Sequence, residues 1–249
     1  MLIPKKIEKD FIYSLIFGEQ NKIKKIISSR EINYERILSI VSSHRIEYLI
    51  LNKLDNFSLL EDLPEDFLNK LKKNYALKSI STLKIIEKVF LLSDKLLETN
   101  IEHVFLKGIS LHDQNMIYFR PMRDIDLLVN PKDIPKVIDL AKSLDFTFKN
   151  EEIDVSERYI NNSKLYDLPI MEDSSGVFLE IHFRITTDTE KCFLLEALFE
   201  KKRLIKVHNN EVCVPCFDSL FTHLVFHSSK KGYFDVGLIA LVDLIQIFD

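Results

Sequence analysis

The spacing of apolar residues predicts helices over the first hundred residues. Between Leu83 and Leu97 the apolar side chains recur at i, i+3 and i+4, while lysines and glutamates occupy the other positions. Pro64 precedes another such piece, in the way a proline often opens a helix. The remaining pieces have the same apolar spacing and cover residues 6–17, 23–29, 34–52 and 65–78. We therefore expect an N-terminal helical region over residues 1–99.

After residue 100 the pattern alternates between short apolar runs and helical spacing. Asn130 and Pro131 suit a helix start, since Asn caps and Pro fits the first turn. The expected strands are 101–106, 124–129, 164–171, 177–185, 204–207 and 211–214. The expected helices are 109–116, 131–144, 218–229 and 235–248, with a polar loop at 150–164. This order predicts an α+β core over residues 100–216 and a helical tail over 217–249, whose lack of an end signal suits a truncated chain.

Composition narrows the class of protein. The 249 residues include only 5 Gly and 7 Pro, 46% are hydrophobic and 29% are charged, which excludes a disordered chain. A net charge of −4 excludes a globally cationic nucleic-acid or membrane binder, although a local basic groove stays open. Three cysteines suit a reducing cytosol. With no signal-peptide core at the start, and an apolar stretch at 237–248 that is too short to span a bilayer, we expect a cytoplasmic protein without a membrane segment.

Carboxylates on two predicted strands form the main candidate site. In a strand, Asp124 and Asp126 share one face, opposite the apolar residues between and after them. Glu180 and His182 share a face of the later strand in the same way. If these strands were neighbours, the three acids would converge, and such a group suits magnesium, a hard cation that prefers carboxylate oxygens.

Each of these residues also has a purely structural interpretation. An isolated Asp-x-Asp on a strand is usually a solvated face, so the combination with a third acid and a preceding glycine turn carries the prediction. Gly108 would let the backbone approach a phosphate, and Lys107 would add a positive charge there or lie at a solvated strand end. Arg120 or Arg123 would bind phosphate with a bidentate fork or form a structural ion pair.

Several of these motifs together resemble a known family. They are Leu106-Lys107-Gly108, Arg120-Pro121-Met122, Asp124-Ile125-Asp126-Leu127-Leu128-Val129, Glu180-Ile181-His182, His44-Arg45-Ile46 and His223-Leu224-Val225-Phe226-His227 with Asp243. From about residue 35 onward, the chain is similar to the uncharacterised bacterial nucleotidyltransferases of the DNA polymerase beta-like superfamily. The resemblance implies a small mixed sheet flanked by helices, and transfer of a nucleotidyl group from an NTP.

The resemblance also implies roles for individual residues. Asp124 and Asp126 would hold two Mg²⁺ ions, or Mn²⁺, and Glu180 would bind metal or activate the acceptor hydroxyl. The turn from Gly108 to Ser110 would lie against the triphosphate. The chain departs from the family pattern in having Ile109 after the glycine, so that the serine is displaced by one position. It also has an arginine, Arg123, where a small residue is usual before the first aspartate.

Other interpretations of the sequence remain open in addition to a nucleotidyltransferase. The same fold without turnover would be a nucleotide-binding or protein-interaction module. His182 is either a substrate or phosphate contact or a supporting residue. His223 and His227 lack the glutamate of a zinc protease motif and are more typical of core histidines. Cys213 and Cys216 have no second cysteine pair to complete a zinc site. The lysine-rich pieces at 22–25 and 70–73 suit solvated helix faces, and the acceptor, whether RNA, protein or small molecule, stays open.

Overall fold

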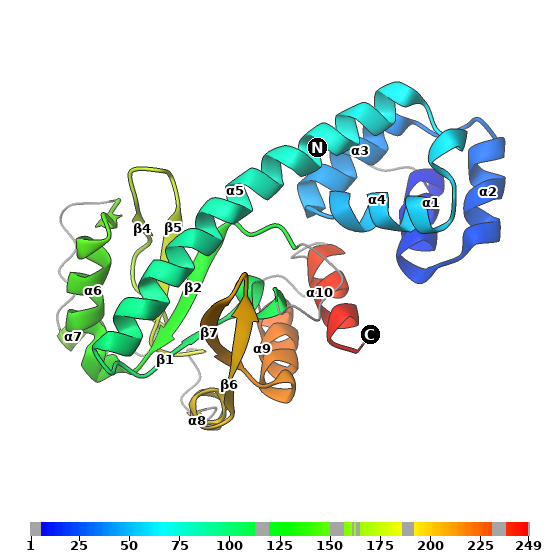
Figure 1. Ribbon diagram of the computed structural model, residues 1–249. Helices are drawn as coiled ribbons and strands as arrows, with labels where there is room; N and C mark the ends of the chain where they lie inside the picture. The colour runs from blue at the N-terminus through cyan, green and yellow to red at the C-terminus, as the bar shows by residue number, and fades with distance from the viewer. Residues whose placement is uncertain are drawn as a thin grey trace.

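A group of short helices at the N-terminal end is joined by one long helix to a mixed β-sheet (Figure 1). The structure is a computed structural model that describes residues 6–112, 120–149, 157–160, 162, 165–185, 192–230 and 238–248. The N-terminal elements are α1 (Lys6–Phe17), α2 (Gln20–Ser28), α3 (Tyr34–His44), α4 (Glu47–Asn56), the 3₁₀ turn η1 (Leu60–Asp62) and α5 (Glu65–Glu98). The predicted helical region is therefore confirmed.

Two helix boundaries in this region differ from the prediction. Residues 34–52 are not one helix, because Arg45 adopts a left-handed conformation with φ of 55° and ends α3. Conversely, 65–78 and 83–97 are parts of the single helix α5. Its central apolar residues Leu77, Ile80 and Leu83 are about half exposed, so the stripe is interrupted although no Gly or Pro breaks the helix. The middle of α5 spans the interval between two hydrophobic cores.

The main sheet has five strands in the order β1-β2-β5-β4-β3. These are β1 (His103–Phe105), β2 (Asp124–Val129), β3 (Thr147–Phe148), β4 (Met171–Glu172) and β5 (Phe178–His182). β2 and β5 run parallel and the other neighbouring pairs run antiparallel, so the sheet is mixed. The α+β prediction is confirmed. The predicted strand 164–171 is mostly wrong, because beside β5 the chain is irregular: Leu168 N donates to Ile181 O and Phe183 N donates to Tyr166 O.

The alternation of β2 separates the two faces of the sheet. Ile125, Leu127 and Val129 pack in one large core with α5 and with α6 (Ile134–Ser143). As predicted, Asn130 is a cap: its side chain accepts from Lys132 N and caps the short 3₁₀ turn that leads into α6. Leu128 points to the opposite face and packs with Leu198 of α8 (Cys192–Glu200), a helix that the apolar spacing did not predict. The carboxylates of Asp124 and Asp126 therefore lie on the face that α8 covers in part.

The remaining elements are helices and a two-stranded sheet (Figure 1). They are the 3₁₀ helices η2 (Lys107–Leu111) and η3 (Pro131–Asp133), α7 (Glu157–Ile160), the hairpin β6 (Lys202–Val207) and β7 (Asn210–Pro215), α9 (Phe217–Lys230) and α10 (Leu238–Phe248). The helix predicted at 109–116 is thus a 3₁₀ turn that begins earlier, and residues 113–119 lie outside the described residues. Part of the loop predicted at 150–164 is helical, namely α7, and 150–156 lie outside the described residues.

The C-terminal helix α10 packs back onto the N-terminal helices. Val242 belongs to the core formed by α1, α3, α4 and the start of α5, and Leu238 N donates to His44 Nδ1 at 3.3 Å. The end of the chain thereby contacts the beginning, a feature that places α10 near the start of β2. The predicted division of the chain into a helical region, an α+β core and a helical tail, with boundaries after residues 99 and 216, stays a prediction.

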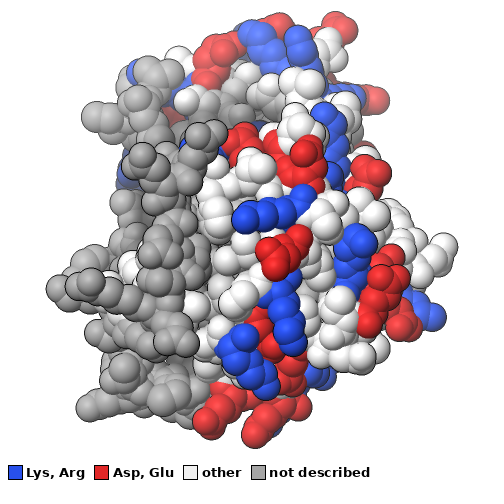
Figure 2. All heavy atoms as spheres, turned by 90° about the vertical axis from the view of Figure 1, so that its left-hand side faces the viewer, with Lys and Arg blue, Asp and Glu red and all other residues white. Residues whose placement is uncertain are grey.

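Surface features agree with the composition. Figure 2 shows acidic and basic side chains interspersed over the described part of one face. Within the lysine-rich pieces, Ile23 and Leu71 are buried while the lysines beside them are exposed, as expected of solvated helix faces. In the described part of the chain, every helix is too short or too polar to cross a bilayer.

Candidate active site

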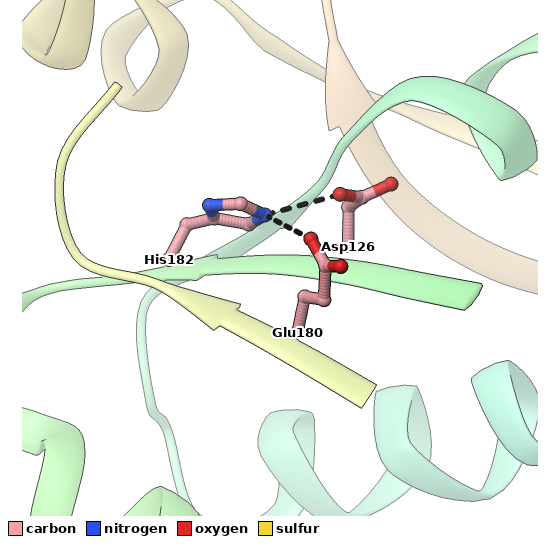
Figure 3. A group of neighbouring side chains, drawn as sticks. All are labelled: Asp126, Glu180 and His182. Atoms are coloured by element: carbon pink, nitrogen blue, oxygen red, sulfur yellow. Dashed lines mark hydrogen bonds and ion pairs between the residues drawn. The ribbon is translucent and has the colours of Figure 1, made fainter. Parts of the chain in front are cut away.

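The parallel pairing of β2 and β5 brings the predicted acids together. In the register of this pair Asp126 lies opposite Glu180, and Leu128 lies opposite His182. One ligand atom from each of Asp126, Glu180 and His182 lies within 4.8 Å of the other two, as Figure 3 shows. Among the described residues, these three form the group that can hold a metal ion. The predicted convergence of Asp126 with Glu180 is therefore present.

His182 lies between the two carboxylates. Its Nε2 is 3.0 Å from Asp126 Oδ1 and 3.6 Å from Glu180 Oε2 (Figure 3). The ring stacks on Tyr166 at an interplanar angle of 5° and a centroid distance of 6.2 Å. Asp126 and His182 are buried, whereas Glu180 is partly exposed, so the group is accessible from the side of Glu180.

Lys107 supplies positive charge to the acids. Its backbone adopts a left-handed conformation with φ of 46°, and its buried ammonium group donates to Asp126 Oδ1. Burial alone would raise the pKa of Asp126, but Lys107 and His182 outweigh it and hold that pKa well below its usual range. Burial alone would lower the pKa of Lys107, but the negative charge of Asp126 outweighs burial, so the pKa of Lys107 is raised. Lys107 and Asp126 thus keep each other ionised.

Asp124 lies beside this group, and its surroundings disfavour the negative charge of its carboxylate. Burial raises the pKa of Asp124 to about 6, and repulsion from Asp126 and Glu180 adds to the rise. A carboxylate held in this way gains from any nearby cation. Asp124 is not within the three-residue group, so its predicted metal role stays a prediction, whereas His182, predicted as a substrate contact, lies among the possible ligands.

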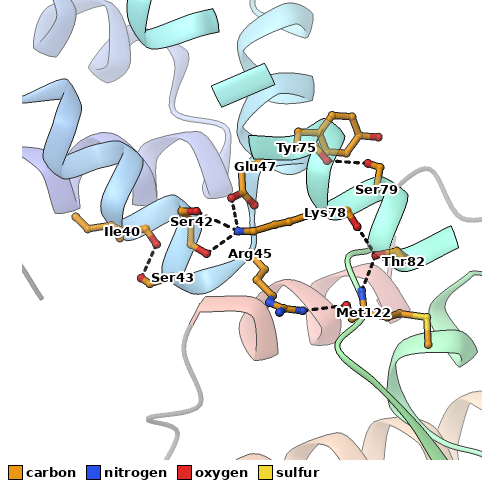
Figure 4. Close-up of polar contacts among 10 residues, drawn as sticks. All are labelled: Ile40, Ser42, Ser43, Arg45, Glu47, Tyr75, Lys78, Ser79, Thr82 and Met122. Carbon is orange, nitrogen blue, oxygen red and sulfur yellow. Dashed lines mark hydrogen bonds and ion pairs between the residues drawn. The ribbon is translucent and has the colours of Figure 1, made fainter. Parts of the chain in front are cut away.

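The segment just before β2 is held by three separate elements. Met122 N donates to Thr82 Oγ1 of α5 at 3.0 Å, and Met122 O accepts from Arg45 Nη1 at 2.9 Å (Figure 4). Arg120 donates from Nε and Nη2 to the two carboxylate oxygens of Asp243 of α10, at 2.7 and 2.9 Å. The helical regions at both ends of the chain therefore position the strand that carries the acids.

Comparison with known proteins places this geometry in a family. Residues 30–249 match the model of a family described as uncharacterised nucleotidyltransferase. The chain belongs to this nucleotidyltransferase family. No curated protein is significantly similar to it.

Solved structures include two distant neighbours. One is the lincosamide antibiotic adenylyltransferase LnuA with lincomycin bound, at 14% identity and a TM-score of 0.44, covering 66% of this chain and 96% of that one. Another is an antigenic nucleotidyltransferase-like protein from Paracoccidioides brasiliensis, at 15% identity and a TM-score of 0.41, covering 65% of this chain and 73% of that one. Likeness at this level is too distant to assign a substrate.

In this family member, the residues of the predicted phosphate turn are buried in η2. A Cβ at Gly108 would lie 3.0 Å from Met122 Cγ and 3.1 Å from Arg120 Nη1, so a larger residue would require these side chains to shift. Ser110 is fully buried, and its hydroxyl donates to Phe105 O at 3.0 Å. These contacts explain both residues structurally, and their roles toward phosphate stay predictions.

Arginine side chains gather at the other side of Asp124. Arg45, Arg120, Arg123 and Asp124 line a pocket of about 140 Å³ at the junction of α3 with the segment before β2. Burial lowers the pKa of Arg45 to about 10, and the positive charges of Arg123 and Arg120 contribute further. Arg123 is exposed, as a ligand-binding side chain requires, whereas the fork of Arg120 is directed at Asp243. The spacing of residues gave no signal for Arg45, which became visible only as part of the family resemblance.

The other sequence candidates are placed differently. His223 and His227 of α9 have ring centroids 6.0 Å apart, and neither is in the metal-binding group of the described residues. Cys213 is buried in β7, and Cys216 Sγ donates to Ser219 Oγ at 3.3 Å. These placements agree with the structural interpretation of the cysteine pair.

Proposed function

We propose that the protein transfers a nucleotidyl group from an NTP to an acceptor hydroxyl with the help of divalent cations. The observation that carries the proposal is the convergence of Asp126 and Glu180 from adjacent parallel strands, with His182 between them. Family membership supports the reaction class. Phosphoryl chemistry of this kind depends mainly on positioning and on neutralising charge, and both are features of this site.

The side chains present fit a divalent metal. Asp126 and Glu180 offer hard carboxylate oxygens, and His182 adds one imidazole nitrogen, a set compatible with Mg²⁺ and Mn²⁺. Burial, together with repulsion from Asp126 and Glu180, raises the pKa of Asp124, so a nearby cation would favour its charged form. We infer that Asp124, Asp126 and Glu180 hold two such ions. Bound there, the ions would neutralise phosphate charge and make the acceptor hydroxyl more acidic.

The arginine pocket suits the phosphates of the donor. Arg45 and Arg123 carry like charges close together at the edge of the acidic group, and an anion would relieve their repulsion. We infer that these two residues bind the triphosphate, with Lys107 adding a fixed positive charge. Arg120, already engaged by Asp243, positions the wall of this pocket.

The proposed reaction is an in-line displacement at the α-phosphorus. The acceptor oxygen forms a bond to phosphorus, the bond to the pyrophosphate oxygen breaks, and pyrophosphate leaves. The hydroxyl proton passes to Glu180, the most exposed acid of the three-residue group. Asp126, kept ionised by Lys107, contributes negative charge that holds the cations throughout.

A second candidate is a nucleotide-binding module without turnover. The observation that favours it is the engagement of Asp126 with both Lys107 and His182, which leaves this carboxylate less available to a metal. Calorimetry would then show NTP binding while no label is transferred to any acceptor.

The test compares a site variant with a matched control. Purified protein is incubated with each α-³²P-labelled NTP, Mg²⁺ or Mn²⁺, and cell extract separated into macromolecules and small molecules. We expect Asp126→Asn to lower label transfer by at least about a hundredfold, the scale found when a charge-stabilising group is removed. Asp139→Asn, an exposed residue of α6, makes the same chemical change away from the site and should leave transfer unchanged. Equal transfer by all three proteins would refute the role of Asp126.

A further inference from the structure

A second pocket lies on the face of the sheet that carries the acids. It has a volume of about 220 Å³ and lies between α8 and α9. Leu198 lines it and packs with Leu128, which follows Asp126 by two residues on the same face of β2. Ile185, three residues after His182, also lines it. The pocket is therefore built against the same strands as the metal-binding group.

His223 is the unexplained residue of this pocket. It lines the pocket and is 5% exposed, and among the described residues neither its Nδ1 nor its Nε2 has a hydrogen-bond partner. A buried polar group without a partner costs stability, so a ligand that hydrogen-bonds to His223 would gain binding free energy here. Helix α9 holds it in place, because Leu220 and Leu224 on either side pack on Leu111 of η2.

The ring of His223 is close enough to the acidic group to be affected by its charges. Burial lowers the pKa of His223 well below its ordinary value, with a further contribution from Lys107, while Asp126 acts in the opposite direction. A neutral imidazole has one donor and one acceptor nitrogen, and either one can hydrogen-bond to an alcohol, which both donates and accepts. An acceptor held by His223 would thus lie on the face of the sheet that carries the acids.

The rest of the lining limits the size and chemistry of the occupant. Most of the surface area of the lining is apolar and comes from side chains such as Leu198 and Ala197. Lys201, Asp218 and Thr222 provide polar atoms at an exposed rim. The volume, about 220 Å³, is smaller than the roughly 300–1,000 Å³ of most small-molecule sites. It suits a compact molecule, whereas RNA needs an extended basic groove.

We propose that this pocket binds the acceptor, a small molecule with an apolar body and an alcohol group that hydrogen-bonds to His223. The proposal rests on the nucleotidyl transfer proposed above. The alcohol oxygen becomes bonded to the α-phosphorus, pyrophosphate leaves, and the proton passes to Glu180. RNA or protein as acceptor would be the contrary outcome.

A binding experiment tests the pocket independently of catalysis. Phenol and cyclohexanol serve as probes in saturation-transfer NMR with the full chain. Ala197→Phe fills the pocket from α8, and Glu196→Phe adds the same side chain at the neighbouring exposed position. We expect the wild type and Glu196→Phe to give strong signals and Ala197→Phe to lose at least fivefold. Absence of a wild-type signal, or equal signals from all three proteins, would overturn the proposal.

A second variant separates a ligand role of His223 from a structural one. His223→Leu removes a buried polar group without a partner, so the midpoint of urea unfolding should stay or rise. Transfer of label should fall at least tenfold while NTP binding, measured by calorimetry, is unchanged. Loss of NTP binding, or unchanged transfer, would contradict the assignment.

The fraction that receives label distinguishes this proposal from the more general one. A labelled product in the ultrafiltrate below about 1 kDa, separated from NTP and NMP, that Ala197→Phe fails to form supports the acceptor pocket. Label on macromolecules alone overturns the pocket's role and leaves nucleotidyl transfer standing. If no fraction is labelled by the wild type, the proposed function is wrong and the acceptor role with it, while the NMR result still decides whether the pocket binds alcohols.

Discussion

The ion pair between Arg120 and Asp243 joins the C-terminal helix to the segment that leads into β2. Changing Asp243 to Asn keeps the shape of the side chain but removes its charge. The guanidinium of Arg120 would then be buried without a carboxylate, since the Arg120 and Asp243 side chains are only 16% and 3% exposed. We expect a large loss of stability from this single change.

The expected magnitude follows from the burial of this pair. Its two hydrogen bonds, at 2.7 and 2.9 Å, are both charge-assisted. Removing one partner of a buried pair costs roughly 3–5 kcal/mol. The pair between Lys202 and Glu102 has a similar 2.7 Å distance but side chains 35% and 49% exposed, so breaking it should cost less than about 1 kcal/mol.

Urea unfolding of four proteins measures this difference: the wild type, Asp243→Asn, Glu102→Gln and the double variant Arg120→Met/Asp243→Leu. The double variant should recover most of the stability, because apolar residues of similar size replace a buried pair at little cost. Similar losses in Asp243→Asn and Glu102→Gln, or a double variant no more stable than Asp243→Asn, would refute the reasoning.

Three further changes have defined outcomes. Gly108→Ala should cost about 1–3 kcal/mol in urea unfolding, because the added Cβ meets Met122 Cγ at 3.0 Å in a packed interior. Burial lowers the pKa of His112 from 6.5 to about 4. The contribution of His112 to the free energy of unfolding is therefore complete above pH 6.5 and is lost as the pH falls toward 4, by about 3 kcal/mol in all. His112→Gln should lack this contribution when unfolding is measured at several pH values. Lys78→Met leaves the buried carboxylate of Glu47 without its ion pair and should lower stability by roughly 3–5 kcal/mol, whereas an unchanged unfolding midpoint would contradict the importance of this contact.

The sequence predicted the part of the site that depends on strand alternation. The strand 124–129 has the expected limits, because Asp124 and Asp126 alternate with apolar residues and the run continues as Leu127, Leu128 and Val129. Placing Glu180 beside it needed the further assumption that two strands far apart in the chain are neighbours, and the register confirms this assumption. Local pattern was sufficient here because one face is wholly apolar and the other carries the acids.

The contacts that assemble the site could not be read from local pattern. The pairing of Arg120 with Asp243 joins residues 123 positions apart, and Arg45 reaches Met122 across 77 positions. Neither contact leaves a periodic signal in the sequence. The left-handed conformation of Arg45, which ends α3, is likewise set by tertiary contacts, since an arginine does not by itself favour it.

The placement of His223 is a similar case. Its spacing from His227 showed a shared helix face, but not that α9 would bring the ring beside a pocket near the acids. Likewise, α8 is nearly all apolar on average, so its helical period was hidden, and its packing on the acidic face of the sheet decides the shape of that pocket.

Calorimetric titration of divalent cations tests the central claim, that Asp126 and Glu180 form part of a cation site. With Mn²⁺ the wild type and Asp139→Asn should bind with equal affinity, and Glu180→Gln should bind at least about tenfold more weakly, because one charged ligand is lost. Affinity should also rise as the pH passes through about 6, where Asp124 releases its proton. Binding by Glu180→Gln as tight as that of the wild type, or no binding by the wild type, would contradict the account.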